Sequence, residues 1–129
     1  MQRQVLEFHE AFGVHAPTRP EIPPPGVRAL RYELIREELE EFKQACDAGD
    51  LTECVDAIGD LLYVVFGSAV SFGVNMEPIV DEIHRSNMSK VWPDGSVRKR
   101  EDGKVEKPAT YSPAKLEGLI IAQQTEASE

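Results

Sequence analysis

The sequence of 129 residues predicts an all-α fold, a bundle of four main helices with a short C-terminal helix. Two observations support this prediction. Apolar residues recur at helical spacing over long segments, and cap residues or glycines stand where these segments begin and end. The length suits a single domain that spans residues 1–129.

The first helix is expected over residues 2–12, where it ends near Gly13. Residues 16–26 contain five prolines, so this segment is predicted to be an extended arm. Such an arm either wraps a neighbouring subunit or simply links two helices. The sequence does not choose between these alternatives.

The two longest helices are expected over residues 27–47 and 51–72, joined by a short loop. Asp50 is the expected N-cap of the second of them, and Gly73 ends it. The fourth helix is expected to begin after Asn75, with a proline in its first turn, and to run to about residue 88.

The helical pattern breaks over residues 91–108. Two Asp-Gly pairs in this segment predict turns and a small hairpin. Ser112 and Pro113 are expected to open a short last helix that runs to about residue 121. The tail, residues 122–129, is expected to be frayed.

The net charge of −9 argues against nucleic acid and against anionic membranes as partners. Residues 57–74 are apolar enough to raise the question of a membrane span, but Asp60 lies inside this run, which favours a buried core helix. The N-terminal residues lack the apolar run of a signal peptide. Cys46 and Cys54 lack metal-site spacing and are expected to be small, reduced core residues. We therefore expect a soluble cytoplasmic protein.

Acidic residues lie on the apolar side of the helix expected over residues 27–47. At about 100° per residue, Glu38 and Glu41 fall within its apolar arc and Glu37 falls at the border of that arc. Glu33 and Glu40 point away from it, toward solvent. A merely solvated acidic surface would show the reverse arrangement, so the inward glutamates call for another explanation.

The following helix repeats this arrangement. Glu53, Asp56 and Asp60 stand at positions i, i+3 and i+7, within about 60° of one another on one face. Glu53 has an alternative role in a capping box with Asp50. Asp60 is the single charge in an otherwise apolar stretch, and a buried carboxylate needs a cation.

A short loop between two antiparallel helices would bring both acidic faces together. Six inward carboxylates without a histidine among them predict a site for a hard cation, Mg²⁺ or Mn²⁺. A ferritin-like di-iron site would need Glu-x-x-His on two helices, and only Asp81 and His84 come close to that form. A calcium loop at Asp94 is excluded because arginines fall at ligand positions.

Two short motifs carry a resemblance to a known family. EELEE at 37–41 and ECVD at 53–56 resemble the EExxE and ExxD halves of the acid motif of MazG-like all-α nucleoside triphosphate pyrophosphohydrolases. The runs DAIGDLLYVVFGSAVSFGV, EIHRSNMSKVW and DGKVEKP are similar to small phage and bacterial members, so the resemblance covers roughly residues 4–120. This superfamily includes dUTP diphosphatases and phosphoribosyl-ATP pyrophosphohydrolases.

The resemblance implies a homodimer or a dimer of dimers with two or more Mg²⁺ or Mn²⁺ ions at the acid motif. It implies hydrolysis between the α and β phosphates, which yields a nucleoside monophosphate and pyrophosphate. The implied metal ligands are Glu37, Glu38, Glu41, Glu53, Asp56 and Asp60. The spacing between the motif halves is slightly short, and an ExxD half anchored on DLLY would make Asp60 the aspartate and place Ala57 at the glutamate position.

Glu38 is the expected acceptor of the proton from the attacking water, and hence the expected catalytic residue. A triphosphate also needs cations at its departing pyrophosphate, and Lys90 and Lys104 are the predicted source. Asn87 precedes Lys90 at the end of the fourth helix, and Trp92 is available to stack on a base. These four residues form the predicted substrate-binding set.

Two classes of function fit the sequence. The first is an enzyme acting on a nucleoside triphosphate, with dGTP and GTP favoured and dUTP as the alternative substrate, in a bacterium or a phage-infected cell. The second is a non-catalytic acidic helical module that binds a partner or buffers metal. The second class leaves the acids on apolar faces unexplained, so we favour the enzyme.

Overall fold

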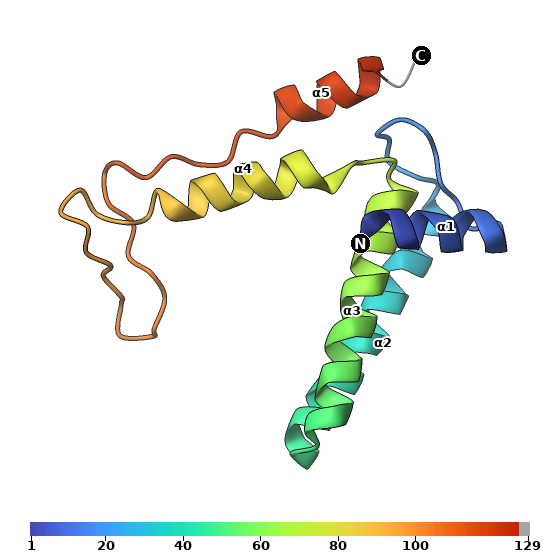
Figure 1. Ribbon diagram of the computed structural model, residues 1–129, viewed down its shortest axis with the longest axis horizontal. Helices are drawn as coiled ribbons and strands as arrows, with labels where there is room; N and C mark the ends of the chain where they lie inside the picture. The colour runs from blue at the N-terminus through green and yellow to red at the C-terminus, as the bar shows by residue number, and fades with distance from the viewer. Residues whose placement is uncertain (127–129) are drawn as a thin grey trace.

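The computed structural model describes residues 1–126 and confirms the all-α fold (Figure 1). An isolated antiparallel bridge joins Lys99 to Val105, within the segment where the Asp-Gly pairs predict a hairpin. The four main helices and the shorter fifth are α1 (Gln2–Phe12), α2 (Pro25–Ala48), α3 (Leu51–Ser71), α4 (Met76–Met88) and α5 (Glu117–Glu126).

The helices α2 and α3 form a long antiparallel hairpin. Pro25 occupies the first position of α2, where its missing N–H costs no hydrogen bond. Gly49 ends α2 in the left-handed conformation with φ 68°, and the Asp50 side chain then accepts a hydrogen bond from the Glu53 N–H. The turn is therefore short, and it fixes the register of the two helices.

Helix α1 crosses the open end of this hairpin and packs on α3. Val5 and Val70 are buried there, but so are the polar side chains of His9 and Arg31. The Arg31 guanidinium donates hydrogen bonds to the Val64 carbonyl at 2.9 Å and to the Ser68 hydroxyl at 3.4 Å. This core of one chain is thus small and partly polar.

The proline-rich arm between α1 and α2 is extended, as predicted, and it packs on its own chain. The Glu21 N–H donates to the Phe72 carbonyl at 2.9 Å, and the Ser71 hydroxyl donates to the His15 carbonyl at 2.9 Å. Gly73, with φ 70°, approaches the Arg19 carbonyl so closely that a Cβ would not fit. The arm therefore folds over the C-terminal end of α3.

Helix α4 extends away from the hairpin and leads into the loop of residues 89–111 (Figure 1). The chain then returns alongside α4. The Lys115 N–H donates to Glu82 at 2.8 Å, and Arg85 donates to the Pro113 carbonyl at 3.2 Å. Helices α1, α2 and α3 of one chain thus pack together, whereas α4 extends away from them together with the loop and the C-terminal segment.

The boundaries predicted for the last helix are wrong at both ends. Residues 112–116 are extended because their backbone groups bond to α4, and the helix begins only at Glu117. The tail is helical to Glu126 because Gln123 exchanges two hydrogen bonds with the Asn75 backbone and Gln124 donates to the Pro20 carbonyl. The last three residues of the predicted frayed tail lie outside the described range.

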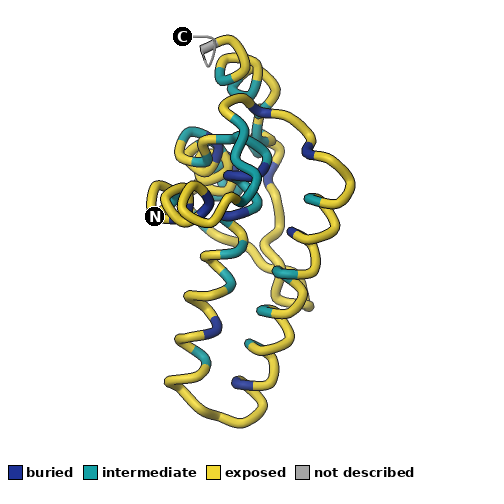
Figure 2. The backbone as a smooth tube through the Cα atoms, turned by 90° about the vertical axis from the view of Figure 1, so that its right-hand side faces the viewer, coloured by how far each residue is buried: buried dark blue, intermediate teal, exposed yellow. Residues whose placement is uncertain are grey.

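The prediction that α3 is a buried core helix is also wrong for the single chain. Only 22% of its most apolar 18-residue window is buried, as the mostly exposed trace in Figure 2 shows. By length and composition α3 is the one described helix that could cross a membrane, which is weak evidence because core helices pass the same test. Its exposed apolar side chains include Leu51, Val55, Ile58, Leu62, Tyr63 and Val65.

Gly67 makes room for the buried arginine, which leads to a prediction. A Cβ at this position would collide with the Arg31 guanidinium and lie 3.2 Å from His9 Nε2. We expect Gly67→Ala to lower the free energy of unfolding by about 1–3 kcal/mol, because Arg31 must leave its hydrogen bonds or strain its side chain. Denaturant unfolding monitored by circular dichroism measures this change.

Gly59→Ala is the matched control in the same helix. Apart from its two chain neighbours and the adjacent backbone of α3, no atom of the described chain lies within 4 Å of the added methyl group. We therefore expect equal or higher stability, since alanine favours a helix by up to about 1 kcal/mol over glycine. Equal effects of the two substitutions would contradict this role of Gly67.

Candidate functional site

Three carboxylates meet at the interface between α2 and α3. One oxygen each from Glu38, Glu41 and Asp60 lies within 4.8 Å of the others. Glu38 and Glu41 are one turn apart on α2, and the antiparallel pairing brings Asp60 of α3 opposite them. We call these three residues the acid cluster. It unites three of the six carboxylates predicted as metal ligands.

Glu38 is the most enclosed member of the acid cluster. It is half-buried, and its Oε2 atom is buried without a hydrogen-bond partner in the described chain. Burial first, and then the neighbouring carboxylates of Glu41, Asp60 and Glu37, raise the pKa of Glu38 to about 7. Three like charges at this separation are costly, and a cation bound between them would remove that cost.

Glu41 and Asp60 are exposed in the single chain. The sequence had indicated a buried Asp60, because the flanking residues are apolar, but those residues are largely exposed too. Ala57, the alternative glutamate position, is 4% exposed and lies against α2. The geometry therefore places Asp60 in the acid cluster, and not Asp56.

The remaining predicted ligands lie around the cluster. Glu53 and Asp56 line a small hollow of about 270 Å³ near the hairpin turn, to which Glu41 also contributes. The capping box predicted for Glu53 is half formed, because the Asp50 N–H donates to the Ala45 carbonyl. Glu37 is exposed and acts on Glu38 through its charge. The hollow thus continues the acid cluster toward the turn.

The predicted substrate-binding residues lie at the end of α4 and in the loop that follows it. Lys90 donates to the Asn87 side chain at 3.0 Å at the end of α4. The Trp92 indole N–H donates to the Glu106 carbonyl, and Arg98 covers one face of its ring at 3.7 Å from the ring centre. Lys104 follows the Asp102-Gly103 turn. Within one chain these residues are separated from the acid cluster (Figure 1).

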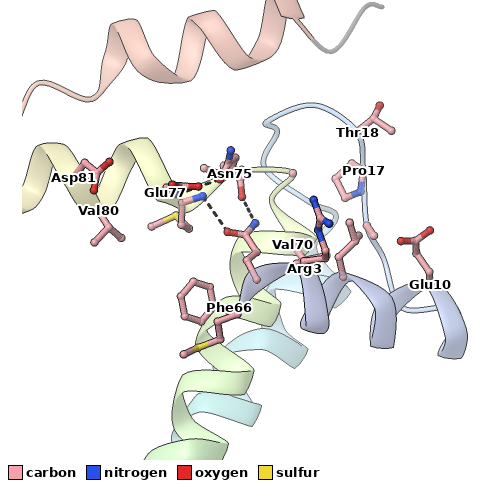
Figure 3. Close-up of a pocket in the computed structure, with 17 residues that line it drawn as sticks. Arg3, Glu10, Pro17, Thr18, Phe66, Val70, Asn75, Glu77, Val80 and Asp81 are labelled. Carbon is pink, nitrogen blue, oxygen red and sulfur yellow. Dashed lines mark hydrogen bonds between the residues drawn. The ribbon is translucent and has the colours of Figure 1, made fainter.

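A larger hollow of about 930 Å³ lies at the opposite end of α3. Figure 3 shows that α1, the arm, α3 and the start of α4 surround it. Its lining combines charged Arg3, Glu10 and Asp81 with apolar Phe66 and Val80. Gln2 closes one side by bonding to the Val74 carbonyl and the Met76 N–H. Its mixed charge and its distance along α3 from Asp60 separate it from the acid cluster.

The chemistry of the acid cluster suits a hard divalent cation. Its donors are carboxylate oxygens alone, the ligands that Mg²⁺ and Mn²⁺ prefer. Glu38 Oε2 is an oxygen without a partner at the centre of the group. Exposed acids also occur without metal, but an enclosed carboxylate with a pKa near 7 indicates a site that a cation would complete.

Residues 5–87 match the sequence profile of phosphoribosyl-ATP pyrophosphohydrolase, and this region includes most of α1 and α4 and all of α2 and α3, with the whole acid cluster. The chain belongs to the phosphoribosyl-ATP pyrophosphohydrolase family. The acid cluster lies within the matched region and is a candidate metal site. Lys90, Trp92 and Lys104 lie beyond the matched residues.

The chain is also similar to uncharacterized protein L479 of Acanthamoeba polyphaga mimivirus, with 43% identity over 53 residues. The similar region covers 41% of this chain and 21% of the viral protein. The chain thus spans about a fifth of the length of the curated relative that it matches. The phosphoribosyl-ATP pyrophosphohydrolase match, which is longer, carries the family assignment.

Two arrangements were not apparent from the sequence. Arg31 lies two helical turns before Glu38 on the same face of α2, where a buried cation was not expected. Gly67 in the facing helix is the signal that could have revealed it, because a glycine in mid-helix often marks a close approach. The loop of residues 89–111, which we call the basic loop, is separated from the acid cluster. No local sequence signal reveals this separation, since it depends on the direction in which α4 leaves α3.

Metal binding at the acid cluster can be measured directly. We expect Glu41→Gln and Asp60→Asn each to weaken Mn²⁺ binding about tenfold or more in titration calorimetry, because each removes a charge from a three-carboxylate site. Glu40→Gln is the matched control, since Glu40 is exposed and outside the cluster. Unchanged Mn²⁺ affinity in both cluster variants would exclude this site.

Proposed function

We propose that this protein is a MazG-like, metal-dependent nucleoside triphosphate pyrophosphohydrolase. It hydrolyses a nucleotide between the α and β phosphates to give a nucleoside monophosphate and pyrophosphate. The observation that carries this proposal is the acid cluster, with its unpaired Glu38 oxygen, inside the region that matches a pyrophosphohydrolase family. The choice of a triphosphate rests on the resemblance of the EELEE and ECVD motifs.

In this proposal some carboxylates bind the metal ions and another accepts a proton. Glu41 and Asp60 would hold Mg²⁺ or Mn²⁺, two or more ions, with Glu53 and Asp56 of the adjoining hollow as further ligands. When bound, the ions would polarise the α-phosphate and acidify the attacking water. Glu38, whose Oε2 atom is buried without a hydrogen-bond partner in the described chain, would accept the proton of that water.

The basic loop supplies the second group of charges that the reaction needs. Lys90 and Lys104, together with Asn87, would bind the departing pyrophosphate. In one chain these residues are separated from the acid cluster, so we propose that a second copy brings its loop to the site. The exposed apolar side chains of α3 support this pairing, because a monomer would leave them in water.

The pairing predicts a homodimer, or a homotetramer built from two dimers. We expect light scattering at micromolar concentration to give at least twice the monomer mass, because the apolar face of α3 needs a partner. An active monomer under these conditions would contradict the proposed composite site.

The reaction itself is tested by the products and by the cluster variants. We expect pyrophosphate and a monophosphate as products, with activity lost in Glu41→Gln and Asp60→Asn while the helical circular dichroism signal is retained. Glu40→Gln should keep the wild-type rate. Release of orthophosphate and a diphosphate would overturn the proposed bond cleavage, and full activity in both cluster variants would overturn the site.

The hollow beside the hairpin turn bears on which base is preferred. We expect dGTP and GTP to be cleaved faster than dUTP, because the short hairpin turn leaves an open hollow that suits a purine. Trp92, which is half-buried with Arg98 over one face of its ring, is the proposed residue to stack on the base. A nucleotide panel measures this preference. Cleavage of dUTP at least tenfold faster than dGTP would favour a dUTP diphosphatase of the same fold.

A thermal melt with Mn²⁺, with and without the nucleotides of this panel, separates the enzyme from a non-catalytic acidic module. Such a module would be stabilised by Mn²⁺ alone in a thermal melt, without a further shift when nucleotide is added. An enzyme of the proposed type shows the additional shift and forms product.

A further inference from the structure

Two cysteines meet at the turn of the α2–α3 hairpin. The sequence predicted small buried core residues, but the structure places Cys46 on the surface and leaves Cys54 half-buried. Their Sγ atoms are 3.9 Å apart, although the residues lie eight positions apart in the chain. At this separation the Cys54 thiol can donate a weak hydrogen bond to the Cys46 sulfur.

The structure of the turn accounts for this proximity. Cys46 is in the last turn of α2 and Cys54 in the first turn of α3. Gly49 in its left-handed conformation and the Asp50 cap between them make the chain reverse sharply, and Asp50 also donates its N–H to the Ala45 carbonyl. The two sulfurs are therefore held facing each other by backbone geometry that does not depend on either thiol.

From this geometry we propose that Cys46 and Cys54 are a reversible disulfide site that closes the end of the hairpin. A disulfide has an S–S length of about 2.0 Å, so the sulfurs must approach by about 2 Å. Rotation of the exposed Cys46 side chain about its Cα–Cβ bond moves its sulfur on this scale.

The oxidant is a low-molecular-weight disulfide such as oxidised glutathione. The thiolate of Cys46, the more accessible sulfur, attacks one sulfur of the oxidant and releases one molecule of thiol, which leaves a mixed disulfide on Cys46. Cys54, as a thiolate, then attacks the Cys46 sulfur and releases the second thiol. Two cysteine thiols are oxidised, one external disulfide is reduced, and the two protons leave on the released thiols.

The bridge would act on the hollow beside it. Glu41 and Glu53 face that hollow from the same two helix ends that Cys46 and Cys54 would join. A covalent link there restricts how far the end of α2 can separate from the start of α3. The redox state would thus limit the opening of the hollow, whatever ligand it takes, and this inference does not rest on the proposed reaction.

The test uses the full-length protein, first reduced and freed of metal, and then equilibrated with oxidised glutathione. We expect intact mass under denaturing conditions to show a monomer that has lost two hydrogens and carries no glutathione. Peptide mapping should give a linked pair containing Cys46 and Cys54. We also expect the bridged form to melt about 5 °C or more above the reduced form, because the link restricts the unfolded chain.

Two single variants serve as controls. Cys54→Ser should stop at the mixed disulfide on Cys46, and Cys46→Ser should react more slowly, since its remaining thiol is half-buried. Wild-type protein that retains glutathione at equilibrium, that links between chains, or that forms the bridge without a change in melting temperature would each overturn the proposal. The mass of the wild-type protein decides the first two outcomes without any variant.

Discussion

The register of α2 against α3 is the constraint on which the other features of this protein depend. The turn at Gly49 and Asp50 fixes that register, and every feature of the interface then occupies a set level along the hairpin. The thiol pair lies at the turn, the acid cluster follows, and Arg31 lies beneath α1 at the open end. A shift by one residue would turn Asp60 by about 100° and disperse the cluster.

The positive charge of Arg31 and the negative charges of the acid cluster lie at different positions along the same α2–α3 interface, and they do not form an ion pair. Arg31 bonds to a carbonyl and a hydroxyl, and burial lowers its pKa. Within residues 1–126, no lysine, arginine or histidine side chain forms an ion pair with the acid cluster. If Arg31 were one turn closer, its charge would offset the carboxylates and weaken the attraction of the cluster for a metal ion. The hairpin thus preserves an uncompensated negative site, which is the condition for binding a divalent ion.

Local sequence signals predicted most of the elements, because their causes are local. Asp50 and Asn75 cap helices as expected, and the Asp102-Gly103 turn lies between the two residues of the single bridge of the described chain. The acid cluster was predictable as a shared face, but not the choice of Asp60 over Asp56, since that depends on the hairpin register. The burial of Arg31 and the helical tail at Gln123 depend on contacts between segments far apart in the chain, which no periodicity reports.

The junction between α3 and α4 is held from three directions. Gln2 bonds on both sides of it, the arm bonds to Phe72, and Gln123 bonds to Asn75. Segments from the beginning, the first third and the end of the chain thus brace one bend. These hydrogen bonds therefore fix the angle between the α2–α3 hairpin and α4 within the subunit. Any assembly of these subunits inherits that angle, and the angle determines how far apart the basic loops and the acid faces of neighbouring copies can lie.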